Sequence, residues 1–215
     1  VDDQLKQPLD AWPLNKPAAK LPEAWTDEER EARTLLAQSG APVVLLGPSG
    51  AGKTWLLRHL LATESTDDDR VIELEARDLE PDAARDPDAV LLQLAVEAAW
   101  ATGLPDEAVQ QAWDALGHPR RRLTRFVERR VLPEVPGRLL LAVDGIDRWT
   151  RGRDRAGLLG LLRAWASAGR APWDRLRVLL TLSTSPSALA PDPTTSPFNL
   201  APPVRMGPLR DEAVA

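Results

Sequence analysis

The eight residues from Gly47 to Thr54 read GPSGAGKT, and they follow directly on the apolar run from Pro42 to Leu46. The pattern Gly, four residues, Gly-Lys-Thr predicts a phosphate-binding P-loop between a strand and a helix. Its glycines let successive backbone N–H groups turn toward phosphate oxygens, and the N-terminus of the following helix adds partial positive charge. Lys53 would then reach the β- and γ-phosphates, and the Thr54 hydroxyl would complete a magnesium shell. The expected nucleotide contacts are Gly47, Pro48, Ser49, Gly50, Ala51, Gly52, Lys53, Thr54 and Trp55.

A chance match is the alternative to this interpretation. The four fixed positions would occur by accident in roughly one of a hundred chains of this length, as a glycine-rich turn with a fortuitous Lys-Thr. The flanking sequence favours the P-loop, because an apolar run typical of a buried strand precedes it and apolar residues at helical spacing follow it. Those residues are Trp55, Leu56, Leu57, Leu60 and Leu61.

The composition excludes several classes of chemistry. The chain has 215 residues, 43% of them hydrophobic, which suits a single α/β domain with one good core. It has no cysteine, so disulfides, thiol nucleophiles and thiolate metal sites are excluded, and with two histidines a transition-metal site is not expected. The net charge of −5 argues against broad nucleic-acid affinity. We find no membrane-spanning run and no secretion signal, so we expect a soluble, cytoplasmic protein without a membrane partner.

Strand and helix patterns alternate along most of the chain. Residues 1–25, rich in Pro, Lys and Asp, are expected to form an arm or linker, and residues 26–215 the P-loop domain. This alternation predicts a doubly wound, mostly parallel five-stranded sheet with helices on both faces. The predicted strands are 42–46, 70–75, 139–143, 177–182 and 203–206, and the predicted helices are 26–38, 53–62, 88–102, 105–116, 119–132 and 153–168, with an acidic insert at 78–88 and a loop at 183–201.

A second acidic feature completes the expected nucleotide site. Asp144 ends the nearly continuous apolar run 139–143 and lies ninety residues after the P-loop, a Walker B pattern. Such an acid holds magnesium at the end of a neighbouring strand, and the separation leaves room for an intervening strand. Asp144-Gly145 is also a common turn pair, so a strand-end turn is the alternative reading.

With these motifs in place, the chain resembles the AAA-like and STAND (NACHT-like) branch of P-loop ATPases, which occur in bacterial signalling and defence proteins. The likeness covers roughly residues 27–213. It rests on the P-loop, on the step Asp144-Gly145-Ile146-Asp147, and on the segments 183–189 and 196–200, which are similar to the Thr-Pro-Ser and Pro-Phe-Asn segments of those ATPase domains.

The resemblance implies roles for individual positions. Lys53, Asp144, Asp147 and Thr184 would be the catalytic residues: Asp144 would hold magnesium through water, Asp147 would polarise the hydrolytic water, and Ser183 or Thr184 would sense the γ-phosphate. One position departs from many AAA+ ATPases, because Gly145 stands where glutamate follows the Walker B aspartate. ATP is favoured over GTP, since no Asn-Lys-X-Asp motif follows the P-loop.

Arginines and tryptophans supply further candidates. Arg121, Arg125 and Arg129 share one helix face, which could touch nucleic acid or a neighbouring subunit's nucleotide, although a solvated face is the simpler interpretation. An arginine finger could be Arg148, Arg151 or Arg153, and ordinary ion pairing is the simpler interpretation there too. We expect Trp55, Trp100 and Trp165 in the core, whereas Trp12 and Trp25 could cover an adenine or a partner surface.

These features lead to a main hypothesis and two alternatives. The first is a regulatory ATPase in which MgATP binding and slow hydrolysis control assembly, protein partners or an attached effector. The chain stops at residues 207–215, where relatives begin a helical lid, so we expect the lid to be absent and turnover to be weak. The second is an interaction scaffold gated by ATP or ADP without significant hydrolysis. A small-molecule kinase is disfavoured, because no acceptor-binding signature is present.

Overall fold

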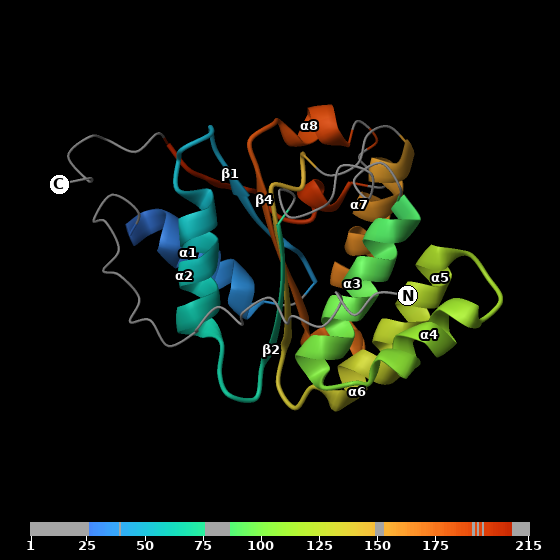
Figure 1. Cartoon of the computed structure of the whole chain (residues 1–215). Helices are drawn as coiled ribbons and strands as arrows, with labels where there is room; N and C mark the ends of the chain where they lie inside the picture. The colour runs from blue at the N-terminus through green and yellow to red at the C-terminus, as the bar shows by residue number, and fades with distance from the viewer. Residues whose placement is uncertain are drawn as a thin grey trace, which may run out of the picture.

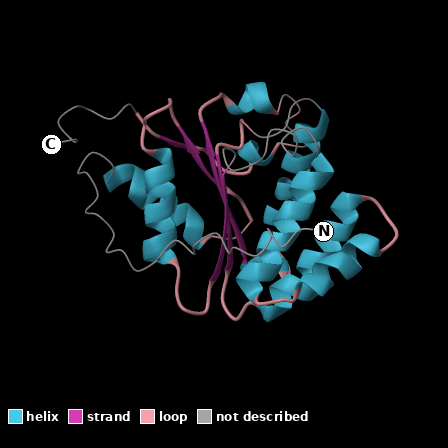
Figure 2. Ribbon diagram, viewed as in Figure 1, coloured by secondary structure: helices cyan, strands magenta, loops and turns pink. Residues whose placement is uncertain are grey.

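The structure, a computed structural model, describes residues 26–38, 40–75, 87–148, 153–190, 192, 194 and 196–207. Its centre is one sheet that lies between helices (Figure 2). The sheet has five strands in the order β2-β3-β4-β1-β5, and every pair of neighbouring strands is parallel. The strands are β1 (Val43–Leu46), β2 (Arg70–Glu75), β3 (Leu139–Asp144), β4 (Leu176–Leu182) and β5 (Val204–Arg205).

Helices cover both faces of the sheet (Figure 1). One face carries α1 (Thr26–Ala37) and α2 (Lys53–Glu64), which pack on β1, β3 and β4. The other face carries α3 (Pro87–Thr102), α4 (Asp106–Asp114), α5 (Pro119–Phe126), α6 (Leu132–Glu134) and α7 (Arg153–Ala166). Among the described helices, none combines the length and the apolar character needed to cross a membrane.

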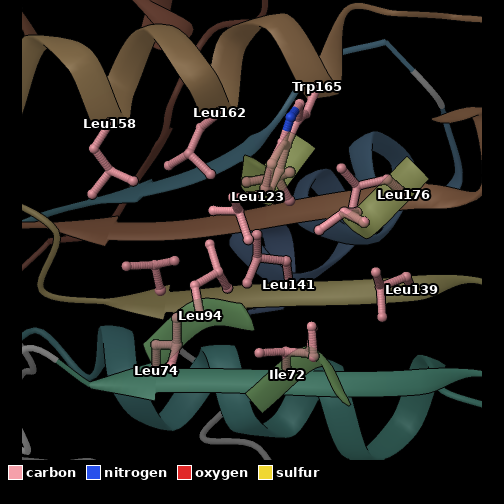
Figure 3. Close-up of a cluster of buried hydrophobic side chains, with 14 of the residues drawn as sticks. Ile72, Leu74, Leu94, Leu123, Leu139, Leu141, Leu158, Leu162, Trp165 and Leu176 are labelled. Atoms are coloured by element: carbon pink, nitrogen blue, oxygen red, sulfur yellow. The ribbon is translucent and has the colours of Figure 1, made fainter. Parts of the chain in front are cut away.

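Two hydrophobic clusters lie on opposite sides of the sheet. The larger one joins β2, β3 and β4 to α3, α5 and α7, with Leu141, Leu162 and Trp165 among its members (Figure 3). The smaller one joins α1 and α2 to the other side, where Leu140 and Ala142 lie. Because successive residues of β3 point into different clusters, the whole strand is apolar up to Asp144.

The strand register brings the functional segments to one edge. β4 lies between β1 and β3 in the sheet, although it follows both of them in the chain. The strand that the ninety-residue separation leaves room for along the chain is β2. Leu46, which precedes the P-loop, is level with Leu182 on β4, and Asp144 is level with Glu75 on β2. The carboxyl ends of four strands therefore meet where α2 begins, which is where ligands bind in open α/β sheets.

Most predicted elements are confirmed within a few residues, and the differences have local causes. The predicted helix 119–132 is interrupted by a π-helical turn, η4 (Val127–Val131). The predicted loop 183–201 contains α8 (Pro186–Leu189) and a 3-10 turn, η6 (Pro197–Asn199), each begun by a proline. A further 3-10 turn, η5 (Trp173–Arg175), precedes β4. The arm 1–25 with its two tryptophans, and residues 76–86 of the acidic insert, lie outside the described residues.

The expectation that Trp100 belongs to the core was wrong. Its side chain is 52% exposed, and its indole N–H donates to Asp106 at 3.2 Å. Helix α3 is apolar around most of its circumference, so the pattern did not distinguish its buried side, where Leu94 and Ala98 lie, from its outer side. Trp165, in contrast, is buried as expected.

Candidate functional site

The P-loop connects the end of β1 to the start of α2 in a curved path. Gly50 and Gly52 both have φ of 80°, a left-handed conformation that favours glycine. Gly52 is the N-cap of α2 and provides no side-chain cap, so the first N–H groups of the helix face the loop. This geometry is the anion cradle that the motif predicted.

Lys53, the first residue of α2, lies inside this loop. Only 9% of it is exposed, and its Nζ donates to the carbonyl oxygens of Gly47 at 2.9 Å and Pro48 at 2.7 Å. Burial lowers the pKa of Lys53, and the nearby carboxylates of Asp147 and Asp144 oppose that shift. The ammonium group is therefore held at the loop by weak acceptors that a phosphate could replace.

The Walker B aspartate contacts the P-loop helix directly. The Thr54 hydroxyl donates to Asp144 Oδ2 at 2.7 Å, and the hydroxyl of Thr181 on β4 donates to Asp144 Oδ1. Thr181 is fully buried, and its hydroxyl oxygen also accepts from the backbone N–H of Gly145 at 2.8 Å. Thr181 thus fixes both the carboxylate and the turn that follows it.

The oxygen atoms of Thr54 and Asp144 fit a magnesium ion. Mg²⁺ prefers hard oxygen ligands and commonly takes one or two from carboxylates or hydroxyls, with phosphate and water as the rest. No group of three or more His, Cys, Asp or Glu residues suited to a metal occurs in the part of the chain that the structure describes. The oxygen atoms of Thr54 and Asp144 would therefore suit a metal ion that is also bound to a phosphate, rather than a metal ion held by protein ligands alone.

A cavity of about 340 Å³ opens between the P-loop and the strand ends. Its size suits a small polar ligand. Six of the nine predicted P-loop contacts line it, whereas Gly47, Pro48 and Ala51 do not. Trp55 lies at its wall and stacks on His59 with ring centres 5.1 Å apart. The lining residues are Ser49, Gly50, Gly52, Lys53, Thr54, Trp55, Glu75, Asp144, Gly145, Arg148, Thr181 and Ser183.

The second acid and the predicted sensor residues lie together. Asp147 Oδ2 accepts from the Ser183 backbone N–H and from the Thr184 hydroxyl, each at 3.2 Å. Asp147 Oδ1 is buried and has no hydrogen-bond partner among the described residues. Asp147 therefore anchors the segment that follows β4, beside the P-loop.

Gly145 has a conformational reason to be glycine. Its φ is 70°, in the left-handed region, where a longer side chain costs roughly 1 kcal/mol or more. Glutamate at this position, as in many relatives of this fold, would be strained in this turn. The left-handed backbone of this turn is therefore a structural reason for glycine, in place of glutamate, at position 145.

Two functional candidates were missed by the sequence analysis. Thr181 sits next to the last residue of an otherwise apolar strand, and Glu75 ends β2 at the same edge as Asp144. Each was recognisable as a polar residue at a strand end. Without the strand order, however, nothing connected either of them to the P-loop.

The predicted arginine candidates separate in the structure. Arg148 lines the cavity beside the P-loop, whereas the side chains of Arg151 and Arg153 are not described. Arg121, Arg125 and Arg129 are all exposed, and Arg125 and Arg129 also line a separate hollow of about 230 Å³ between α4 and the α5–η4 segment. This arginine groove is formed by Arg122, Arg125, Arg129 and Arg130 over a floor that includes Ala108, Ala112 and Phe126.

Within the described residues, no ion pair joins any of the four groove arginines to an acid, and the buried Nε of Arg122 has no hydrogen-bond partner. The π-helical turn η4 carries Arg129 and Arg130. Turns of this kind are frequent at functional sites. The exposure of Arg121, Arg125 and Arg129 agrees with the solvated face that the sequence favours, and the groove adds a shared hollow beside two of them.

Comparison with known proteins identifies a matching family and several solved structures of similar fold. A family model described as an AAA-like domain matches residues 24–215. No curated protein sequence matches the chain. Among solved structures, the Walker-type ATPase paby2304 of Pyrococcus abyssi is similar, with a TM-score of 0.58 and 20% identity over 88% of this chain and 55% of that one.

Two further solved structures share the fold. CDC6p of Pyrobaculum aerophilum has a TM-score of 0.57 and 14% identity over 90% of this chain and 47% of that chain. Drosophila ORC bound to DNA has a TM-score of 0.52 and 20% identity over 82% of this chain and 40% of that chain. The chain thus spans about half the length of these proteins or less. The parallel five-stranded sheet with helices on both faces confirms the predicted P-loop ATPase fold class.

Proposed function

Because the chain belongs to the AAA-like domain family, we propose that it binds MgATP at the P-loop and hydrolyses it slowly. The observation that carries this proposal is the hydrogen bond of 2.7 Å between Thr54 and Asp144, which are ninety positions apart in sequence. It joins the Walker A helix to the Walker B strand beside Lys53. A fortuitous glycine-rich turn has no reason to meet a strand-end aspartate there.

Each residue has a proposed role in binding. Lys53 would exchange its two carbonyl acceptors for the β- and γ-phosphate oxygens. Thr54 and Asp144 would hold Mg²⁺, which when bound neutralises charge on the phosphates. Arg148, at the cavity wall, would add a further positive charge. The half-buried Trp55 would pack against the nucleotide from the other side.

Asp147 and the segment after β4 would respond to the γ-phosphate. Ser183 lines the cavity, and both Ser183 and Thr184 donate to Asp147. A γ-phosphate oxygen that accepts from Ser183 or Thr184 would compete with Asp147 for the same donors. Binding of a γ-phosphate would thereby shift the segment that leads into α8, which begins two residues after Thr184. That Asp147 also polarises the attacking water remains a prediction from the sequence.

The finer assignment is a regulatory role of the STAND type. In this role, the nucleotide state would control self-assembly, protein partners or an attached effector. The alternative is a nucleotide-gated scaffold that binds ATP or ADP without significant turnover. It is favoured by Gly145, which leaves the usual position of the catalytic glutamate without a carboxylate. Measured phosphate release separates the two.

Nucleic acid is a further possible partner. The expectation against it rested on the net charge of −5 alone. Drosophila ORC, a protein of this fold, was solved bound to DNA, so the fold does not support that exclusion. The arginine groove is the candidate contact for a polyanion, because its four arginines line one hollow and are not paired with carboxylates in the described chain.

The experiment that tests binding is calorimetric titration of MgATP into the wild type and Lys53→Ala. We expect the variant to lose at least tenfold in affinity, since its charge-assisted bonds to phosphate are worth about 1.5–3 kcal/mol. Arg70→Ala is the control, because Arg70 is cationic but bonds carbonyl oxygens at the start of β2, away from the P-loop. Equal affinity of Lys53→Ala and the wild type would refute the proposed site.

A further inference from the structure

The arginine groove lies on the opposite side of the sheet from the P-loop helix α2 (Figure 1). Helix α4 and the α5–η4 segment form its two walls, and both pack on α3, which lies between them and the sheet. The residues that line the groove and those that line the cavity beside the P-loop are two separate sets. The groove is therefore a surface that the proposed nucleotide chemistry does not use.

Four arginines gather on one wall of the groove. Arg122, Arg125 and Arg129 follow one another at spacings of three and four residues, and the π-helical turn η4 brings Arg130 to the same hollow. Like charges four residues apart destabilise a helix, as Arg125 and Arg129 do here. The fold thus accepts a cost at this wall that a negatively charged partner would offset.

The acids of the neighbouring elements are engaged elsewhere. Glu128, in η4, accepts from the indole N–H of Trp173 at 3.2 Å and lies 3.7 Å from Arg170. Asp106, at the start of α4, accepts from the indole N–H of Trp100. Within the described chain, the four guanidinium groups of the groove form no hydrogen bond and no ion pair. A partner's carboxylates could therefore form charge-assisted hydrogen bonds with them.

The floor of the groove is apolar and consists largely of small side chains. Ala108, Ala112 and Ala115 follow at spacings of four and three, so α4 and its C-cap offer only methyl groups to the hollow. Phe126 closes the floor from α5 and is buried, whereas Leu116 at the rim is 94% exposed. An apolar cavity of about 150 Å³ holds a benzene-sized group. The hollow of about 230 Å³ therefore has room for an aliphatic side chain of a partner.

Charge and floor together favour an acidic peptide over a nucleic acid. Nucleic acids meet proteins largely through phosphate and sugar, which would satisfy the arginines and leave the apolar floor uncovered. Stacked bases need an open aromatic face, and Phe126 is buried. A long polyanion would also be repelled by the rest of a chain whose net charge is −5. A short segment with acidic and apolar side chains avoids these costs.

We propose that the arginine groove binds an acidic peptide segment of a partner protein, an inference that rests on the polyanion contact of the proposed function and not on nucleotide binding. Glutamate or aspartate side chains of the segment would pair with the exposed Arg125 and Arg129, whose guanidinium groups can each hold a carboxylate through two hydrogen bonds. An apolar side chain between two acidic ones would enter the hollow at Ala112 and Phe126.

The test uses two labelled peptides and two labelled DNA molecules. The first peptide is built of glutamate-glutamate-leucine repeats, and the second has serine in place of each leucine. Fluorescence anisotropy titrations with the full chain should show that the leucine peptide binds about tenfold or more tightly than the serine peptide, because burial of one leucine side chain contributes that factor. Single-stranded and duplex DNA of matched length should bind more weakly than the leucine peptide.

Matched variants separate the groove from general charge. Arg121 and Arg125 are both exposed and lie one turn apart on α5, but only Arg125 lines the groove. Arg125→Gln should weaken binding of the leucine peptide about two- to fivefold, and about tenfold together with Arg129→Gln. Arg121→Gln should bind as the wild type does. Ala112→Phe fills the hollow and should abolish the preference for leucine over serine. Circular dichroism checks that each variant is folded.

The possible outcomes are distinct. Equal binding of the two peptides, or equal losses in Arg121→Gln and Arg125→Gln, would overturn the inference. DNA that binds more tightly than the leucine peptide would also overturn it and leave the polyanion contact standing. Absence of binding by all four probes would overturn both. These titrations contain no nucleoside triphosphate, so the proposed MgATP site stands or falls separately, by calorimetry.

Discussion

Replacing Thr181 by valine removes one hydroxyl and keeps the shape of a fully buried side chain. That hydroxyl donates to Asp144 Oδ1 and accepts from the Gly145 N–H at 2.8 Å. Hydrogen bonds to a charged group are worth about 1.5–3 kcal/mol and neutral ones about 0.5–1.5 kcal/mol, so the two together predict a loss of about 2–4.5 kcal/mol. The free energy of unfolding of a domain is about 5–15 kcal/mol. The loss in free energy of unfolding caused by Thr181→Val should therefore be large enough to measure in a urea titration.

Thr181→Ser is the matched control, because it keeps the hydroxyl and removes only a methyl group, at a cost of about 1 kcal/mol. Thr181→Val should be the less stable variant, and it should also bind MgATP more weakly, since Asp144 and the turn after it lose their common anchor. A valine variant as stable as the serine variant would refute the reasoning, because it would show that the hydroxyl contributes no net stability at this position.

The remaining predictions concern pH and turnover. Burial by itself would raise the pKa of Asp69, but hydrogen bonds from the side chain and backbone of Arg138 and from the Thr66 N–H lower it to about 2. An unfolded aspartate titrates near 3.9, so this stabilisation, at most about 2.6 kcal/mol, is complete above that pH and is lost as the pH falls toward 2. Urea titrations should thus show Asp69→Asn less stable than the wild type at pH 7 and nearly equal at pH 2. Asp147→Asn should release phosphate more slowly than the wild type while still binding MgATP. Release at background in both proteins would instead favour the scaffold.

The sequence predicted the P-loop and Asp144 because their chemistry is written in short, local patterns. A strand, a glycine-rich turn and a helix are neighbours in the chain, and Asp144 directly follows an apolar strand. The positions of Thr181 and Glu75 at the cavity depend on β4 and β2 flanking β3, and a strand order is set by long-range packing. Local patterns carry no such information.

Helix details show the same limit. The apolar residues of 119–132 predict a helix, yet their spacing does not distinguish the π-helical turn η4 from continuous α-helix. Trp100 was misplaced for a related reason, because α3 has small apolar residues on nearly all sides and periodicity then gives no orientation. Where one side of a helix is clearly polar, as for α1, the prediction was confirmed.

The arginine groove gives this acidic protein a strongly uneven charge distribution. Four guanidinium groups lie together on one side of a chain whose net charge is −5, so negative charge must exceed positive charge by about nine elsewhere, the arithmetic being −5 minus +4. The positive charge of the groove is thus local, in a chain that is acidic as a whole. Within the Debye length, about 10 Å at 0.1 M salt, an approaching polyanion would be turned toward the groove before contact, and an approaching polycation away from it. Local positive charge of this kind would let an acidic chain meet a polyanion at one place on its surface.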